Sequence, residues 1–361
     1  MTKNIEDLKP TRPNIIDINT DDAIGFYRKM DTKETVKQML EGKYVIVEEY
    51  FSNGLQVLEE LKKNLSSKYQ GKDFQTQRDY RSVYREVSHR LVIKIVDNKI
   101  TVKKAPQIGW LEILYPEISD FYISFPEVQG MNSSWQWHKK GLEIKTLGIN
   151  LHPYYGTYFP TRFDHLKLFD KWLKKYEGSK EKAIEIGVGS GILSFQLIQN
   201  GFNDIYASDT NKNAIIGVKE EAKRLGYEDK ITLNHADLFE NCDVKADVIV
   251  FNPPWIKAKH KLEEGIDKAM YYEGELFNNF FEQAMQHLNP NGKIVLIFSN
   301  LAQVVDDNTS HPIIDELRNN NRFRKDLHLT REVRASSRKT KRTDQRANEK
   351  VELWVLALKK K

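Results

Sequence analysis

Short apolar segments alternate with amphipathic ones from about residue 183 onward, and this alternation constrains the fold more than any other feature. The order is typical of a parallel β-sheet covered by helices on both faces. Strands are expected at 183–186, 205–208, 231–235, 247–251, 293–298, 323–329 and 351–358. Helices are expected at 165–176, 190–200, 213–225, 275–288 and 313–318, where apolar residues recur at helical spacing.

Residues before about 150 show a different pattern, which predicts a separate α+β domain. Helices are expected at 21–30, 32–40 and 54–65, and strands at 91–96, 100–104 and 111–114, with a turn at Asp97-Asn98. A length of 361 residues is sufficient for two domains. We therefore expect an α+β domain at 1–150, which recognises the substrate, and a sheet domain at 151–361.

The cysteine and histidine content restricts the class of protein. Cys242 is the only cysteine, which excludes an intramolecular disulfide and favours a reducing compartment. The polar N-terminus and the lack of a long apolar run predict a cytoplasmic protein without a signal peptide or membrane span. The nine histidines show no metal-ligand spacing, so we expect no metal site.

Positive charge is concentrated in one stretch near the C-terminus. The formal net charge is +5, and residues 331–350 contain eight Lys or Arg against three acids, which alone gives +5. We expect a surface loop that binds RNA phosphates, and a solvated loop without a partner is the alternative. The basic residues assigned to this contact are Arg334, Arg338, Lys339, Lys341, Arg342 and Arg346.

Three glycines follow the first strand of the sheet domain and precede a helix. Gly187, Gly189 and Gly191 allow a tight turn and a close approach of a ligand to the backbone. Their spacing differs from the dinucleotide fingerprint, which needs its third glycine one residue later. Glu185 lies two residues before the turn, where an acid suits a ligand with positive charge, such as the methionine ammonium of S-adenosylmethionine (SAM).

Two further acids end the next two strands. Asp209 is expected to accept hydrogen bonds from both ribose hydroxyls, although a helix N-cap is the alternative. Asp237 is expected to accept from the adenine amino group, with Leu238 or Phe239 beside the ring, although a turn residue is the alternative. Because the carboxyl ends of parallel strands meet at one edge of a sheet, these acids predict a SAM site with Glu185.

The segment Asn252-Pro253-Pro254-Trp255 ends the fourth strand. The prolines remove N–H donors and leave carbonyl oxygens free to accept, and an asparagine amide offers both an acceptor and a donor. Together they can hold an –NH2 group with its lone pair facing a methyl donor, and Trp255 can stack on a planar acceptor. A rigid loop without a ligand is the alternative.

In the order and separation of these motifs, the chain resembles the class I SAM-dependent methyltransferases. It is similar to their Asn-Pro-Pro-aromatic branch, which contains release-factor glutamine methyltransferases and "methyltransferase small" RNA methyltransferases. The resemblance covers about residues 155–305 and implies that Asn252 and the Pro253 carbonyl hold the target nitrogen. It also implies that the segment containing Pro160 and Thr161 closes over SAM. The chain departs from the branch in having Trp255, where Tyr or Phe is usual, and in its N-terminal domain.

The expected fold is an α/β, seven-stranded Rossmann-like methyltransferase sheet with helices on both faces and a reversed last strand, preceded by the α+β domain. The expected activity is SAM-dependent methylation of an amide or exocyclic amine nitrogen, with a slight preference for an RNA base. A protein glutamine or a small molecule is the alternative acceptor. A non-catalytic SAM-binding or RNA-binding scaffold is the rival, but a scaffold has no use for Asn-Pro-Pro-Trp beside a SAM site.

Overall fold

The protein is described by a computed structural model that covers residues 7–71, 74–160, 162–258, 271–305, 309–333 and 349–359. It divides the chain into two compact units. The smaller unit is Thr11–Lys139, and the larger one contains the preceding residues to Pro10 and the chain from Lys140 onward. The sequence placed the division at residue 150. The hairpin of β6 (Leu142–Ile144) and β7 (Ile149–Leu151) lies in the larger unit.

The smaller unit mixes helices with one five-stranded sheet. Its strands are β1 (Ile24–Phe26), β2 (Val45–Val47), β3 (Leu91–Val96), β4 (Lys99–Ile100) and β5 (Phe121–Ser124). β1, β2 and β3 are parallel, whereas β4 and β5 run antiparallel to β3. The helices are α1 (Thr32–Leu40), α2 (Phe51–Lys68), α3 (Phe74–Ser88), α4 (Trp110–Leu114) and α5 (Phe125–Lys140). The unit is therefore α+β, as predicted.

Two predictions within this unit are wrong, and of the strand expected at 100–104 only Ile100 lies in a strand, at the end of β4. The helix expected at 21–30 is absent, because Ile24–Phe26 pairs with β2 instead. The strand expected at 111–114 belongs to α4, where Leu111 and Leu114 are both buried at helical spacing. The turn at Asp97-Asn98 is confirmed, with φ of 50° and 56°, the left-handed values that a tight hairpin turn requires.

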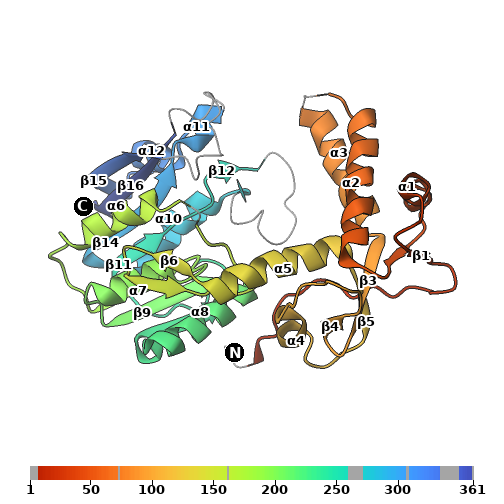
Figure 1. The fold of residues 1–361 in the computed structure, drawn as a ribbon. Coiled ribbons are helices and arrows are strands. Elements are labelled where there is room, and N and C mark those ends of the chain that lie inside the picture. The colour runs from red at the N-terminus through yellow and green to blue at the C-terminus, as the bar shows by residue number, and fades with distance from the viewer. Residues whose placement is uncertain are drawn as a thin grey trace. The chain divides into compact units, whose positions relative to one another are not determined.

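The larger unit is built on a seven-stranded sheet, drawn in Figure 1. Its strands are β8 (Lys182–Ile186), β9 (Asp204–Asp209), β10 (Ile231–His235), β11 (Ala246–Phe251), β14 (Leu288–Ser299), β15 (Phe323–Glu332) and β16 (Lys350–Leu358). They are arranged in the order β10-β9-β8-β11-β14-β16-β15, with β16 antiparallel to both neighbours. Each strand overlaps the segment predicted for it, and the reversed last strand is confirmed.

Helices cover both faces of this sheet, each over its own apolar cluster (Figure 1). On one face lie α6 (Asp164–Leu173), α7 (Ile192–Gln199) and α8 (Lys212–Leu225), and on the other lie α10 (Leu276–His287) and α12 (Pro312–Asn319). Within β14, Val295 faces the first cluster and Leu296 the second. This alternation is what a strand buried on both sides produces. Shorter elements are the 3-10 turn η2 (Glu228–Lys230), β12 (Ile256–Lys257), β13 (Tyr271–Tyr272) and α11 (Leu301–Val305).

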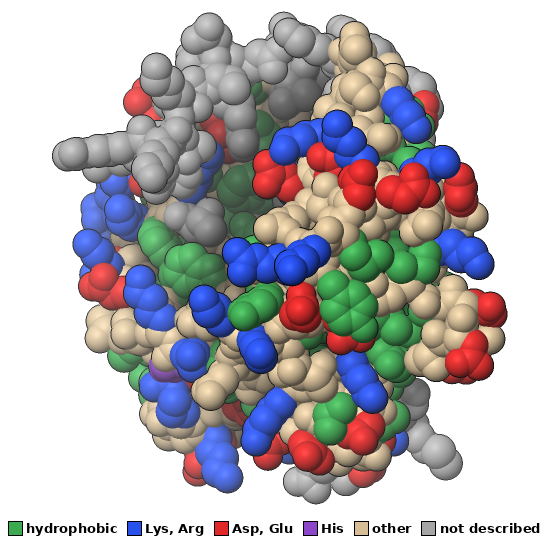
Figure 2. All heavy atoms as spheres, turned by 45° about the vertical axis from the view of Figure 1, so that its right-hand side comes forward, with side chains coloured by type: hydrophobic (Ala, Val, Ile, Leu, Met, Phe, Trp, Pro, Cys, Tyr) green, Lys and Arg blue, Asp and Glu red, His purple; other side chains and the backbone are tan. Residues whose placement is uncertain are grey.

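Charged side chains of both signs are interspersed on the face shown in Figure 2, with hydrophobic side chains in small groups between them. Among the described residues drawn there, neither sign of charge covers the face. None of the helices in the described part of the chain has the length and apolar character needed to cross a membrane.

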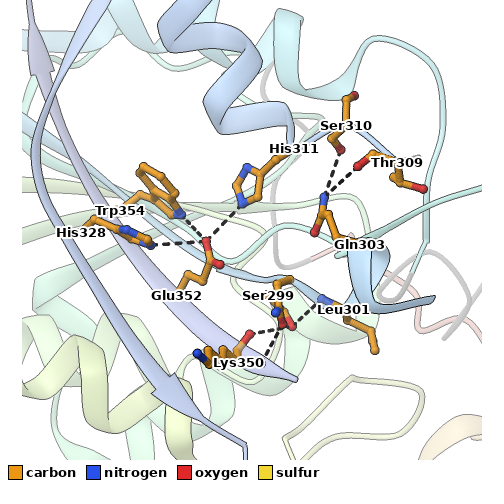
Figure 3. Close-up of polar contacts among 11 residues, drawn as sticks. Ser299, Leu301, Gln303, Thr309, Ser310, His311, His328, Lys350, Glu352 and Trp354 are labelled. Carbon is orange, nitrogen blue, oxygen red and sulfur yellow. Dashed lines mark hydrogen bonds and ion pairs between the residues drawn. The ribbon is translucent and has the colours of Figure 1, made fainter. Parts of the chain in front are cut away.

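A cluster of titratable groups is centred on Glu352 of β16 (Figure 3). Its Oε2 accepts hydrogen bonds from His311 Nε2 at 3.1 Å and from Trp354 Nε1 at 2.6 Å. His328 Nε2 lies 3.4 Å from the same oxygen, and its ring stacks on Trp354 with centroids 3.8 Å apart. The cluster joins β15 and β16 to the residue that precedes α12.

The free energy of unfolding should decrease as the pH falls from neutral, because two groups of this cluster titrate in the same sense. Burial opposes the charge of Glu352, but hydrogen bonds from His311 and Trp354 outweigh it and leave its pKa below 4.5. Burial lowers the pKa of His328 below 6.5. Neutral His328 therefore stabilises the fold above pH 6.5, and ionised Glu352 does so above pH 4.5. Both contributions are lost as the pH falls through the folded-state pKa values.

Urea unfolding at a series of pH values checks this expectation. Glu352→Gln should lower the free energy of unfolding at pH 7 by about 1–3 kcal/mol, since charge-assisted hydrogen bonds are lost. The variant should also depend less on pH below 4.5. Glu332→Gln, at an exposed position of β15, is the control. Superimposable pH profiles for wild type and Glu352→Gln would contradict the assignment.

Candidate active site

The glycine turn after β8 has the backbone that the sequence predicted. Gly187, Gly189 and Gly191 have φ of 68°, 51° and 78°, in the left-handed region that favours glycine. A Cβ at Gly191 would lie 2.9 Å from the Phe195 ring, and one at Gly187 would lie 3.5 Å from the Phe251 ring. The turn therefore packs against the last residue of β11, directly before Asn252.

Glu185 lies beneath this turn and is 1% exposed. Its Oε2 accepts a hydrogen bond from the Ser194 hydroxyl of α7. Burial raises the pKa of Glu185 to about 8, against the opposing effect of Ser194, and the charge of Asp209 raises it further. A carboxyl group in this position gains from a nearby cation, because a cation favours the ionised form. Ser194 had no signal in the sequence, because it lies in α7 and its partner lies in β8, so no spacing within one element relates the two.

Asp209 ends β9, next to β8, and it braces the glycine turn. The backbone N–H of Gly189 donates to Asp209 Oδ2, and that of Asn211 donates to Oδ1, both at 2.8 Å. Burial raises the pKa of Asp209, although the same two N–H groups oppose the shift. The N-cap of α8 is Asn211, whose side chain accepts from the Asn213 N–H, so the N-cap alternative for Asp209 is wrong. Each carboxylate oxygen retains capacity for another donor.

The segment before α6 lies beside the turn, held by two asparagines that the sequence analysis did not identify. Asn211 Nδ2 donates to the Gly156 carbonyl and Asn213 Nδ2 to the Tyr155 carbonyl, both at 2.9 Å. A Cβ at Gly189 would lie 3.7 Å from the Tyr158 carbonyl oxygen. Tyr158 is 40% exposed.

Asp237 follows β10 and is exposed, whereas Leu238 is 7% exposed. Leu238 has φ of 46°, and its carbonyl accepts a hydrogen bond from the Ser208 hydroxyl at 2.7 Å. The Phe239 ring is stacked on His287 at 4.8 Å inside the apolar cluster, so it cannot flank a ligand. Of the residues predicted around an adenine, Asp237 and the Leu238 backbone lie at the sheet edge.

The Asn-Pro-Pro-Trp segment follows β11, and β11 pairs with β8. Pro253 is buried, and Asn252 and Trp255 are partly exposed. The Trp255 indole N–H donates to Asn252 Oδ1 at 3.3 Å. The Trp255 ring contacts His165 edge-to-face, with centroids 6.2 Å apart. Because β9, β8 and β11 are adjacent, Asp209, Glu185 and Asn252 come to one region of the carboxyl edge.

Comparisons with known proteins identify the family. The family model of the methyltransferase small domain matches residues 164–311. A provisionally named protein N5-glutamine methyltransferase of Methanocaldococcus jannaschii is 32% identical over 168 residues, which are 44% of this chain and 80% of that protein. The chain belongs to the class I SAM-dependent methyltransferases. Its Asn-Pro-Pro-Trp segment places this methyltransferase in the Asn-Pro-Pro-aromatic branch.

Other relatives are matched over part of their length. The release factor glutamine methyltransferase of Lactococcus lactis is 28% identical over 141 residues, which are 36% of this methyltransferase and 52% of that protein. The chain thus spans about half of that relative. Among solved structures, ribosomal protein L11 methylase from Lactobacillus delbrueckii subsp. bulgaricus gives a TM-score of 0.39 at 19% identity, over 56% of this chain and 82% of that chain.

Two of the predicted contacts, that of Thr161 with SAM and that of the basic residues with RNA, involve residues outside the described part of the chain. Pro160 is buried at the end of the segment beside the turn, but Thr161 lies outside the described residues. The basic residues Arg334, Arg338, Lys339, Lys341, Arg342 and Arg346 also lie outside them. In the described part of the methyltransferase, no group of His, Cys, Asp or Glu has the arrangement of a metal site.

Proposed function

We propose that this methyltransferase holds SAM against the glycine turn and the ends of β8, β9 and β10. Three observations fit such a cofactor: the left-handed glycines, the buried Glu185 carboxyl and the Asp209 carboxylate at the edge. Glu185 would favour the methionine ammonium through its charge. Asp209 would accept from ribose hydroxyls with the lone pairs that Gly189 and Asn211 leave free, and Asp237 would accept from the adenine amino group.

We further propose that Asn252 and Pro253 bind the nitrogen that is methylated. SAM supplies an activated methyl group, so the protein needs to align the acceptor and stabilise the charge that develops on it. Asn252 Oδ1 and the Pro253 carbonyl would accept the two hydrogens of an –NH2 group. Their oxygens would then face a nitrogen that becomes more positive, and this interaction strengthens in the transition state.

The acceptor we propose is the side-chain amide of a protein glutamine. The observation that carries the proposal is Asn252-Pro-Pro-Trp255 at the end of β11, beside the glycine turn. The relatives named as protein N5-glutamine and release factor glutamine methyltransferases support a protein acceptor. The preference for RNA depended on basic residues outside the described part of the chain, so it gains no support from the structure.

Transfer from methyl-labelled SAM tests this proposal. The protein is incubated with labelled SAM and purified release factors, and with fractionated cell extract. Label should enter a protein fraction, resist nuclease, be released by protease and appear as N5-methylglutamine after digestion and mass spectrometry. Asn252→Ala is the control, because label that still appears with this variant was transferred by another enzyme. Label that is released by nuclease would exclude the glutamine acceptor and restore an RNA base as the better substrate.

A further inference from the structure

Trp255 donates a hydrogen bond to the side chain that is proposed to bind the acceptor. Its indole N–H lies 3.3 Å from Asn252 Oδ1. We propose that Trp255 is a positioning residue, whose N–H fixes the orientation of the Asn252 carboxamide. The inference rests on the proposed function, in which the same Oδ1 accepts a hydrogen from the acceptor nitrogen.

A carboxamide has two orientations that differ in which end faces a neighbour. The oxygen accepts hydrogen bonds, while the –NH2 group only donates. An indole N–H only donates, so it is satisfied only when the oxygen of Asn252 faces Trp255. The oxygen has two lone pairs, and the second remains for an –NH2 group. In the reversed orientation, the Asn252 –NH2 group would meet two donors and could accept from neither.

The indole can select one orientation of the Asn252 carboxamide because the position of the indole itself is fixed. Trp255 packs against the apolar clusters on both faces of the sheet. His165 of α6 meets the ring edge-to-face, at an interplanar angle of 84°. His165 is 5% exposed, and burial lowers its pKa to about 4, so the imidazole is neutral near pH 7. The direction of the N–H is therefore set by packing.

Trp255→Phe separates this role from packing alone, because phenylalanine keeps an aromatic ring but has no N–H. We expect kcat to fall about tenfold, the effect of losing one hydrogen bond that acts on the transition state. KM and the Kd for SAM should change little. Trp137→Phe, at an exposed tryptophan of the smaller unit, is the matched control and should leave kcat unchanged. An unchanged kcat in Trp255→Phe would overturn the inference.

Double-mutant and isosteric variants distinguish the hydrogen bond donated by the Trp255 indole from the shape of its ring. In the Asn252→Ala background, Trp255→Phe should have no further effect on kcat, since the group it positions is gone. A full tenfold loss in that background would show that Trp255 acts independently of Asn252. If phenylalanine lowers Tm, replacement of Trp255 by 3-benzothienylalanine keeps the bicyclic shape and removes only the N–H. That variant should reproduce the loss of kcat.

A measurement without substrate keeps the inference separate from the proposed function. In 15N-labelled protein, the indole resonance lost in Trp255→Phe identifies the Trp255 N–H. Asn252→Ala should shift that resonance and accelerate its exchange with solvent, because the acceptor has been removed. A resonance insensitive to Asn252→Ala contradicts the contact, whatever the enzyme methylates. A sensitive resonance without transfer to glutamine contradicts only the proposed substrate.

Discussion

Replacing Asn252 by alanine should lower kcat roughly 100- to 1000-fold, the range seen when one side-chain group that stabilises developing charge is removed. The proposed contact of Asn252 Oδ1 is with the acceptor nitrogen, so it strengthens only as that nitrogen becomes cationic. The Kd for SAM should stay within about twofold, since the side chain does not contribute to the proposed cofactor contacts. Steady-state methyl transfer and calorimetric titration with SAM measure the two quantities.

Asn291→Ala provides the matched control for this prediction. Asn291 is exposed and lies near the start of β14, at the opposite edge of the sheet from Asn252. Its replacement should leave both kcat and the Kd for SAM unchanged. Near-normal turnover in Asn252→Ala would show that the carboxamide does not act on the acceptor. A loss of SAM affinity equal to the loss of kcat would instead move Asn252 into the cofactor site.

Replacing Asp209 by alanine should weaken SAM binding roughly 10- to 100-fold, as expected for the loss of hydrogen bonds to a charged group. The variant removes the proposed ribose acceptor. It also removes the hydrogen bond from the Gly189 N–H to the carboxylate, which holds the glycine turn in place. Asp209→Asn should have a smaller effect, because one side-chain oxygen still accepts.

Asp204→Ala controls for the loss of an acid from the same strand. Asp204 begins β9, at the edge away from the glycine turn, and pairs with Lys182 on the surface. Calorimetry should give it the wild-type affinity for SAM. The Tm without SAM, compared among the variants, reports the structural part of the change. Equal SAM affinity in Asp209→Ala and wild type would remove Asp209 from the cofactor site.

The central strands of the larger unit could be predicted because each is a short apolar run that is buried on both faces, whereas β15 at the sheet edge is largely exposed. An apolar run depends only on neighbouring residues, so it can be recognised without knowing which strands pair, as in β11 and β14. The strand expected at 111–114 was wrong because four residues are too few to distinguish helical from strand spacing of apolar residues. The helix expected at 21–30 was wrong because pairing with β2 decides the structure there.

The residues at the carboxyl edge could be predicted by type and position, but their contacts could not. Asp209 was identified as an acid at a strand end, yet its hydrogen bond to the Gly189 N–H depends on the turn geometry. The bond from Ser194 to Glu185 joins a helix to the preceding strand, and those from Asn211 and Asn213 to the segment before α6 join residues distant in sequence. Spacing within one element carries no information about such contacts.

The position of β16 has a consequence for the order in which the sheet can be completed during synthesis. β16 follows β15 in the chain but lies between β14 and β15. When the ribosome has produced residues up to Glu332, β14 and β15 have been made but β16, the strand that pairs with both, has not. Until Leu358 has emerged, the edge of β14 presents unpaired backbone groups, which invite pairing with other chains. A fragment cut within residues 334–348 should thus aggregate, even though it contains every residue assigned to SAM and to the acceptor.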